Sequence, residues 1–170
     1  VDAGVVKTNV AFYNFGPVGA NKSDFLVGGY IYSDMLIPKV QFMNNETLFA
    51  VGDSRLMFFK GDQVPVSARE DMVNEEVQSV FYNENYVGLV FRSNDAKGRY
   101  RLDVYSAKPD VVGSFYFDIE YNDIFFEKEG FVVYNETECV IKTFEGAEKY
   151  NGNFTKSVDL MLPTNSAYKY

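Results

Sequence analysis

Short apolar runs alternate with short polar segments from one end of the chain to the other. The clearest stretch holds four such runs, rich in Val, Tyr and Phe, at residues 77–82, 86–91, 100–105 and 111–117. Asn, Asp, Gly and Pro cluster between the runs, which is typical of turns. Runs of this length and composition predict four successive strands of an antiparallel meander.

The third of these runs shows the most regular alternation. Tyr100, Leu102 and Val104 fall on one face of an extended strand, and Arg101 and Asp103 fall on the other. The pattern predicts a strand with one buried and one wet face.

The four-run unit recurs along the chain. We divide the sequence into complete units at about 38–70, 77–118 and 121–156 and partial units at about 1–36 and 157–170. The equivalent positions Val40, Val80, Ile124 and Leu160 are 40, 44 and 36 residues apart. A period near 40 with four strands per period is typical of propeller blades. We therefore predict an all-β partial propeller of about three to four blades, with a β-sandwich as the alternative.

Three details refine the units. Pro65 cannot donate to a strand ladder, so the fourth run of the first complete unit, 63–67, is expected at a sheet edge. The acidic stretch 71–76 is interpreted as a solvated crossing to the next unit. Residues 158–162 predict the first strand of a further unit, and 167–170 look like another strand.

The sequence has no initiator Met and stops within that predicted strand. We interpret residues 1–170 as a single domain that is a fragment of a larger propeller. The apolar flanks of an open ring favour contact between chains, so self-association of the fragment is expected.

The composition of the chain limits its number of domains, its binding partners and its cross-links. A chain of 170 residues with 46% hydrophobic residues suits one domain with its own core. Its net charge of −8 would repel nucleic acid and an anionic membrane surface. The one cysteine excludes an internal disulfide, and no signal peptide or transmembrane run is present in these residues.

The absence of histidine excludes several chemistries. A Ser-His-Asp triad, a Cys-His dyad and imidazole-ligated metal sites all require a residue that the chain lacks. Cys139 lies in an alternating strand and is interpreted as a small buried hydrophobe. We expect no cofactor and no metal, and we assign no catalytic or partner-binding residue.

One segment approaches a phosphate-binding loop. Residues 16–23 resemble Gly-x4-Gly-Lys-Ser, but Asn21 replaces the second glycine. That loop also requires a following helix, whereas residues 24–29 look like a strand that starts with an acid. The sequence therefore argues against a nucleotide site here.

Two sets of residues could serve a carbohydrate. Asp118, Glu120 and Asp123 cluster near the crossing between two units, although their spacing fits neither a two-carboxylate hydrolase nor a calcium loop. Pairs of tyrosines one residue apart could form a stacking platform or could pack between sheets; they are Tyr30 with Tyr32 and Tyr168 with Tyr170.

Asn-x-Ser/Thr triplets in predicted turns or outer segments begin at Asn21, Asn45, Asn135 and Asn153. They would matter as glycan acceptors only in a secreted eukaryotic protein.

The segments 12–21, 38–42 and 77–82 together resemble an uncharacterised family of single-pass, membrane-anchored proteins of clostridia-type Gram-positive bacteria. The resemblance implies a WD-repeat-like propeller domain outside the membrane, with an N-terminal anchor beyond this chain. It carries over no activity, because the family has none assigned. The chain lacks the Trp-Asp and Gly-His dipeptides of true WD repeats.

We therefore expect a non-enzymatic interaction or scaffold domain at the extracellular side of the cell envelope, with a protein or peptide partner. A carbohydrate-binding or carbohydrate-processing envelope protein is the alternative.

Overall fold

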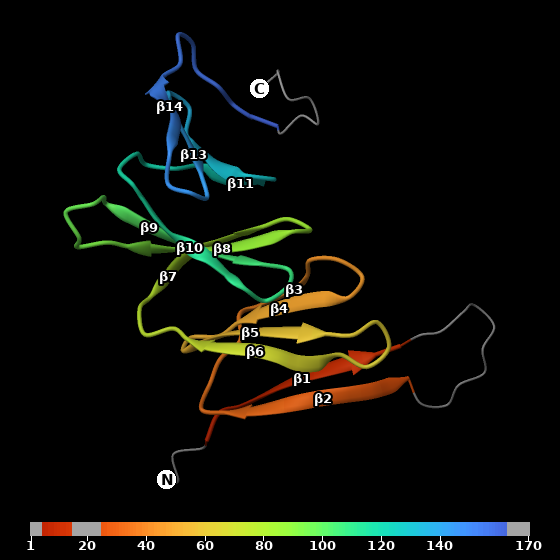
Figure 1. Cartoon of the computed structure of the whole chain (residues 1–170). Helices are drawn as coiled ribbons and strands as arrows, with labels where there is room; N and C mark the ends of the chain where they lie inside the picture. Colours follow the sequence, from red (N-terminus) through yellow and green to blue (C-terminus); the bar gives the residue numbers. More distant parts are fainter. Residues whose placement is uncertain (1–4, 15–24, 163–170) are drawn as a thin grey trace. The chain divides into compact units, whose positions relative to one another are not determined.

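The computed structural model describes residues 5–14 and 25–162, which form β-strands joined by turns (Figure 1). Within these two ranges, no helix is long and apolar enough to cross a membrane. In chain order, the strands are β1 Lys7–Tyr13, β2 Leu26–Ser33, β3 Lys39–Phe42, β4 Thr47–Val51, β5 Arg55–Lys60, β6 Val66–Met72, β7 Val77–Tyr82, β8 Tyr86–Arg92, β9 Tyr100–Ser106, β10 Val111–Phe117, β11 Asp123–Glu127, β12 Gly130–Tyr134, β13 Glu138–Thr143 and β14 Glu148–Asn153.

These strands form three four-stranded sheets and one hairpin. Each sheet pairs its strands in chain order, as β3-β4-β5-β6, β7-β8-β9-β10 and β11-β12-β13-β14, and β1 pairs with β2. All of these pairings are antiparallel. Four-stranded meanders are the architecture of propeller blades, whereas a sandwich would divide its strands between two sheets. The predicted fold class is therefore confirmed, and each complete unit found in the sequence corresponds to one sheet.

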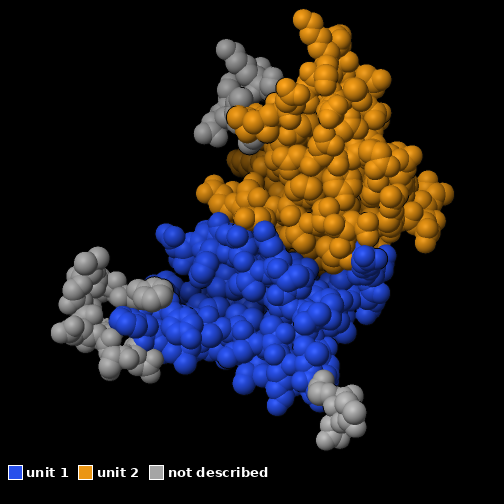
Figure 2. Space-filling view, turned by 180° about the vertical axis from the view of Figure 1, so that it is seen from behind, with its two compact units in different colours: residues 1–76, 107–109 blue, residues 77–106, 110–170 orange. Residues whose placement is uncertain are grey.

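The chain divides into two compact units, which Figure 2 colours separately. Unit 1 comprises residues 1–76 and 107–109, and unit 2 comprises residues 77–106 and 110–170. The hairpin and β3–β6 therefore belong to unit 1, and β7–β14 belong to unit 2.

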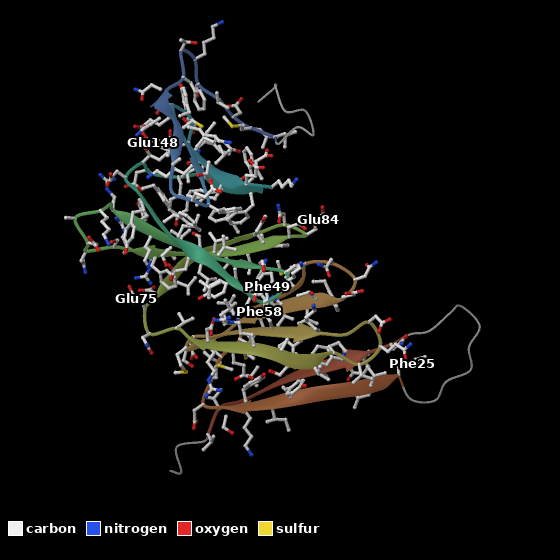
Figure 3. The ribbon with its side chains drawn as sticks, viewed as in Figure 1. Phe25, Phe49, Phe58, Glu75, Glu84 and Glu148 are labelled. Atoms are coloured by element: carbon white, nitrogen blue, oxygen red, sulfur yellow. The ribbon has the colours of Figure 1, made fainter. Side chains whose placement is uncertain are left out.

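Burial follows the position of a strand in its sheet. Every residue of β4 and β12, the second strands of their sheets, is buried. Phe49 of β4 lies opposite Phe58 of β5, and neither is exposed to solvent (Figure 3). The fourth strands β6 and β14 are mostly exposed. The fourth strand β10 differs, because its Phe115 and Phe117 are buried.

The core of unit 2 lies where the alternating pattern places it. Tyr100, Leu102 and Val104 are at most 3% exposed and belong to one apolar cluster. Arg101 and Asp103, on the other face of β9, form an ion pair of 3.1 Å between Nε and Oδ1. The first strands of the two sheets, β7 and β11, lie close to each other, as the inner strands of neighbouring blades do.

Three turns contain the same arrangement of side-chain to backbone hydrogen bonds. An asparagine at the start of each turn accepts hydrogen bonds of 2.8–3.0 Å from the backbone N–H groups two and three residues later. The asparagines are Asn44, Asn83 and Asn135. This local bonding closes a tight connection without help from the core, which fixes the register of the strands on either side.

Two expectations about strand limits are wrong. The fourth strand of the first complete unit begins after Pro65, at Val66, and runs through residue 72, so Asp71 lies in β6 rather than in a crossing loop. An exposed edge strand needs no apolar face, so the charged residues of β6 did not show the apolar alternation that predicts a strand. Residues 158–162 form no strand, and residues 167–170 lie outside the described ranges.

Replacing Gly130 with Ala is expected to lower the free energy of unfolding by about 3 kcal/mol. A Cβ at this position would lie 2.1 Å from the backbone oxygen of Lys142, which cannot move without breaking the ladder between β12 and β13. Urea denaturation measures the change. Gly28→Ala is the control, because its Cβ would meet only Val64 Cγ1, at 3.5 Å, and equal losses in both variants would contradict the steric argument.

Candidate functional site

The acidic crossing between β10 and β11 forms an ionic cluster in unit 2. Arg99 joins it by two contacts: its NH1 pairs with Glu120 Oε1 at 2.5 Å, and its backbone N–H donates to Asp118 Oδ1 at 2.9 Å. The Tyr100 hydroxyl donates to the other oxygen of Glu120. The guanidinium of Arg92 lies 5.1 Å from the centre of the Tyr100 ring. The cluster thus holds the crossing against the start of β9.

The electrostatics keep Glu120 ionised. The hydrogen bond from Tyr100 lowers the pKa of Glu120 most, and Arg99 lowers it further, against an opposing effect of desolvation. Burial raises the pKa of Tyr100, and its hydrogen bond to Glu120 raises that pKa further. The hydrogen bond and the charge of Glu120 raise the pKa of Arg99. Neither Glu120 nor Tyr100 is therefore tuned to exchange a proton near neutral pH.

The remaining predicted carboxylate is also engaged locally. Asp123 Oδ1 accepts a hydrogen bond of 2.8 Å from the backbone N–H of Ile124. In the described part of the chain, no group of three or more His, Cys, Asp and Glu residues could hold a metal ion. The geometry therefore accounts for Asp118, Glu120 and Asp123 as contacts that shape the crossing.

In the Glu120→Gln variant, the pKa of Tyr100 is expected to fall, because the charge of Glu120 and the hydrogen bond to it both raise that pKa in the native protein. Burial keeps the value above its ordinary level. Titration of the tyrosine ring signals by NMR measures the shift. Asp118→Asn, which removes the neighbouring charge, should leave Tyr100 unchanged, and a Tyr100 pKa that is the same in Glu120→Gln would contradict the assignment.

The tyrosines of β2 pack inside unit 1. The Tyr30 ring lies 5.0 Å from that of Phe59, and its hydroxyl accepts a hydrogen bond of 2.9 Å from the backbone N–H of Ser67. Tyr32 is 9% exposed, and its hydroxyl donates to Glu70 at 3.5 Å. Packing between sheets is therefore confirmed over a stacking platform for this pair. Tyr168 and Tyr170 lie outside the described residues.

Tyr32 is expected to make the stability of the protein sensitive to alkaline pH. Burial first, and the charge of Glu70 second, raise the pKa of Tyr32 from 10.0 to about 12. The folded protein thus holds this proton more tightly than the unfolded chain, so the contribution is complete below pH 10.0 and is lost as the pH rises to about 12. Urea midpoints across this range should fall less in Tyr32→Phe than in the native protein. Tyr13→Phe, at an exposed position, is the control, and parallel curves for the native protein and Tyr32→Phe would refute the linkage.

The structure describes Cys139 and some, but not all, of the other sequence motifs. Cys139 is 2% exposed and burial raises the pKa of its thiol, which confirms a small buried hydrophobe. Residues 16–23 lie outside the described ranges, but the element that follows them is strand β2 rather than a helix.

Of the asparagines that begin Asn-x-Ser/Thr triplets, Asn135 donates a hydrogen bond of 2.7 Å from its side-chain amide to the backbone oxygen of Glu120, so this nitrogen has a structural role. Asn45 and Asn153 are exposed, and Asn21 is among the residues not described.

A further surface lies on the β1–β2 hairpin and escaped the sequence analysis. On the face turned away from the core of unit 1, Tyr13, Leu26 and Ile31 are 58%, 50% and 70% exposed. They border a hollow of about 450 Å³, which is also lined by Asn9, Ala11, Val27, Gly28 and Gly29. We call this surface the hairpin outer face. Its apolar residues predicted a strand in a partial unit, but the sequence pattern does not show which of them are exposed.

The fold and these surfaces define an all-β protein of propeller-like sheets whose predicted carboxylates are engaged in structural contacts. The whole chain, residues 1–170, matches the model of a family of unknown function, DUF5711, and the chain belongs to that family. The resemblance found in the sequence is thus confirmed at this coarser level. No curated protein matches the chain.

Part of the chain is also similar to solved structures of Hsv2. The Kluyveromyces marxianus protein is 14% identical with a TM-score of 0.46, over 71% of this chain and 40% of that one. The Kluyveromyces lactis protein is 13% identical with a TM-score of 0.43, over 73% and 37%. The chain therefore spans about two fifths of the length of the Hsv2 chains that it matches.

Proposed function

We propose that the chain is a non-enzymatic protein-interaction or scaffold module. The hairpin outer face is the observation that supports this function most directly. Three large apolar side chains, each at least half exposed, surround one hollow on a two-stranded sheet. Contiguous apolar surface of this kind is typical of sites that bind another protein. Burial of Ile31 and its neighbours against a partner would remove this surface from water.

We place the module at the extracellular side of the cell envelope of a Gram-positive bacterium, held by a membrane anchor outside this chain. The resemblance of residues 12–21, 38–42 and 77–82 supports this placement. Protease treatment of intact cells tests it: an outward-facing domain is digested while cytoplasmic proteins survive. Survival of the domain would contradict the placement.

The carbohydrate alternative requires aromatic rings and carboxylates that converge in one pocket. Tyr30 and Tyr32 are instead packed inside unit 1, whereas Asp118 and Asp123 of unit 2 accept backbone hydrogen bonds. These contacts favour a protein partner over a sugar.

Replacing Ile31 with Glu is expected to abolish capture of the partner by the immobilised chain, because a charge would then lie in the buried contact. Pull-down from the native organism, with mass spectrometry of the captured proteins, measures the effect. Val111→Glu is the matched control, since Val111 is 55% exposed on β10, and it should retain the partner.

Binding to an unbiased glycan array, or glycoside turnover that is lost in Asp118→Asn or Asp123→Asn, would overturn the proposal in favour of the carbohydrate alternative. Equal capture by the native chain and Ile31→Glu would show that the hairpin outer face is not the binding surface.

A further inference from the structure

The hairpin outer face is hollow because its middle pair of residues is small. Cross-strand pairs of β1 and β2 on this face are Asn9 with Ile31, Ala11 with Gly29, and Tyr13 with Leu26. The first and last pairs carry long side chains, whereas the middle pair has a single methyl group between its two residues. All six residues line the hollow of about 450 Å³, so Ala11 and Gly29 form its floor.

The space above Gly29 is bounded by the hairpin itself. The three heavy atoms nearest to a Cβ built at Gly29 would all belong to β1, and the backbone oxygen of Val10 would be the nearest, at 2.9 Å. No side chain from another described element is among them. The floor of the hollow is therefore open to a group that comes from outside the hairpin.

Unit 2 shows how this chain fills a place of the same kind. A Cβ built at Gly88 of β8 would lie 2.6 Å from Cζ of Phe126 of β11. The two residues come from different sheets, so an aromatic ring of one sheet occupies the space that the glycine leaves on the other. A ring packed on a glycine is thus an established contact between sheets in this molecule, and the hairpin outer face offers the same floor.

The polar groups of the hollow are few. Among the described residues that line it, none is charged, and only Asn9 and Tyr13 have polar side chains. Asn9 is exposed, and its Oδ1 lies 3.6 Å from the position of a Cβ at Gly29. A sugar brings several hydroxyl groups that need more polar partners than these two. An aromatic ring with one hydroxyl group needs apolar surface and a single acceptor, which this hollow supplies.

We propose that the hairpin outer face binds a tyrosine side chain of the partner protein. The ring lies over Ala11 and Gly29, and its hydroxyl donates a hydrogen bond to Oδ1 of Asn9. Tyr13, which is 58% exposed at the border of the hollow, packs against the incoming ring, since aromatic rings attract one another edge to face. The inference rests on the proposed function, because it names the side chain that the partner presents to the same surface.

NMR titration of the isotope-labelled chain with N-acetyl-L-tyrosinamide tests the proposal. The backbone amide signals of Ala11, Gly29 and Ile31 should shift saturably. N-acetyl-L-phenylalaninamide should bind about fivefold more weakly, because it lacks the hydroxyl group that donates to Asn9. N-acetyl-L-alaninamide, which has no ring, should cause no shift.

Three variants separate the contributions of shape and polarity. Ala11→Leu fills the hollow with an apolar group and should abolish binding of the tyrosine compound, while its urea midpoint stays near that of the native chain. Lys7→Leu is the matched control, because Lys7 is an exposed residue of the same strand that does not line the hollow, and it should bind normally. Asn9→Ala should bind the tyrosine and phenylalanine compounds equally.

Equal shifts with all three amides, or unchanged binding in Ala11→Leu, would overturn the inference. Saturable shifts of Ala11 and Gly29 with methyl β-glucoside in place of the tyrosine compound would overturn it in favour of the carbohydrate alternative.

Two further arms identify the source of the ring. Saturation-transfer NMR should detect the tyrosine compound on the protein purified from the native organism. Loss of binding there would show that the same protein covers its own hollow, and would overturn the assignment to a separate partner. In the pull-down, Ala11→Leu should lose the captured protein as Ile31→Glu does. If Ala11→Leu captures it normally and Ile31→Glu does not, the proposed function stands and this inference alone fails.

Discussion

Apolar side chains on both faces of the middle strands are the constraint on which this structure depends. Every residue of β4 and of β12 is buried, so each of these strands directs apolar groups to two sides of its sheet. A sheet of this kind is stable only when other elements cover both faces. In unit 2, the cluster that contains Leu102 of β9 and Phe131 of β12 joins two sheets. Stacked four-stranded meanders satisfy the constraint with short connections, which explains why one pattern recurs along the chain.

Polar interactions shape the ends of the strands rather than the core. Glu120 and Arg99 are largely exposed, and exposed ion pairs stabilise proteins little. These contacts instead determine the path of the backbone, because Tyr100 and Arg99 together fix where the crossing leaves β10. The lowered pKa of Glu120 therefore reflects its two hydrogen-bond donors and not a catalytic role.

The sequence predicted those features that local periodicity controls. Alternation around Leu102 identified a strand and its buried face, and Pro65 marked a sheet edge correctly although β6 begins just after it. Periodicity alone does not show whether the residues on one face of a strand bind a ligand or pack in the core. Tyr30 and Tyr32 share a face whether they bind a sugar or pack on Phe59, and only the neighbouring sheet settles the choice. It did indicate that residues 1–36 form only a partial unit, and the hairpin β1-β2 agrees with that division.

The open edge of β1 can persist because the hairpin gains its stability from packing rather than from further pairing. A two-stranded hairpin alone is marginally stable in water. Here Phe12, Tyr30 and Tyr32 lie in the apolar cluster of unit 1, so the facing sheet holds the hairpin in place. Its backbone edge therefore stays extended, although β1 pairs only with β2 among the described strands. A preformed edge has little conformational entropy left to lose, which favours the addition of a strand to it over the folding of a new sheet.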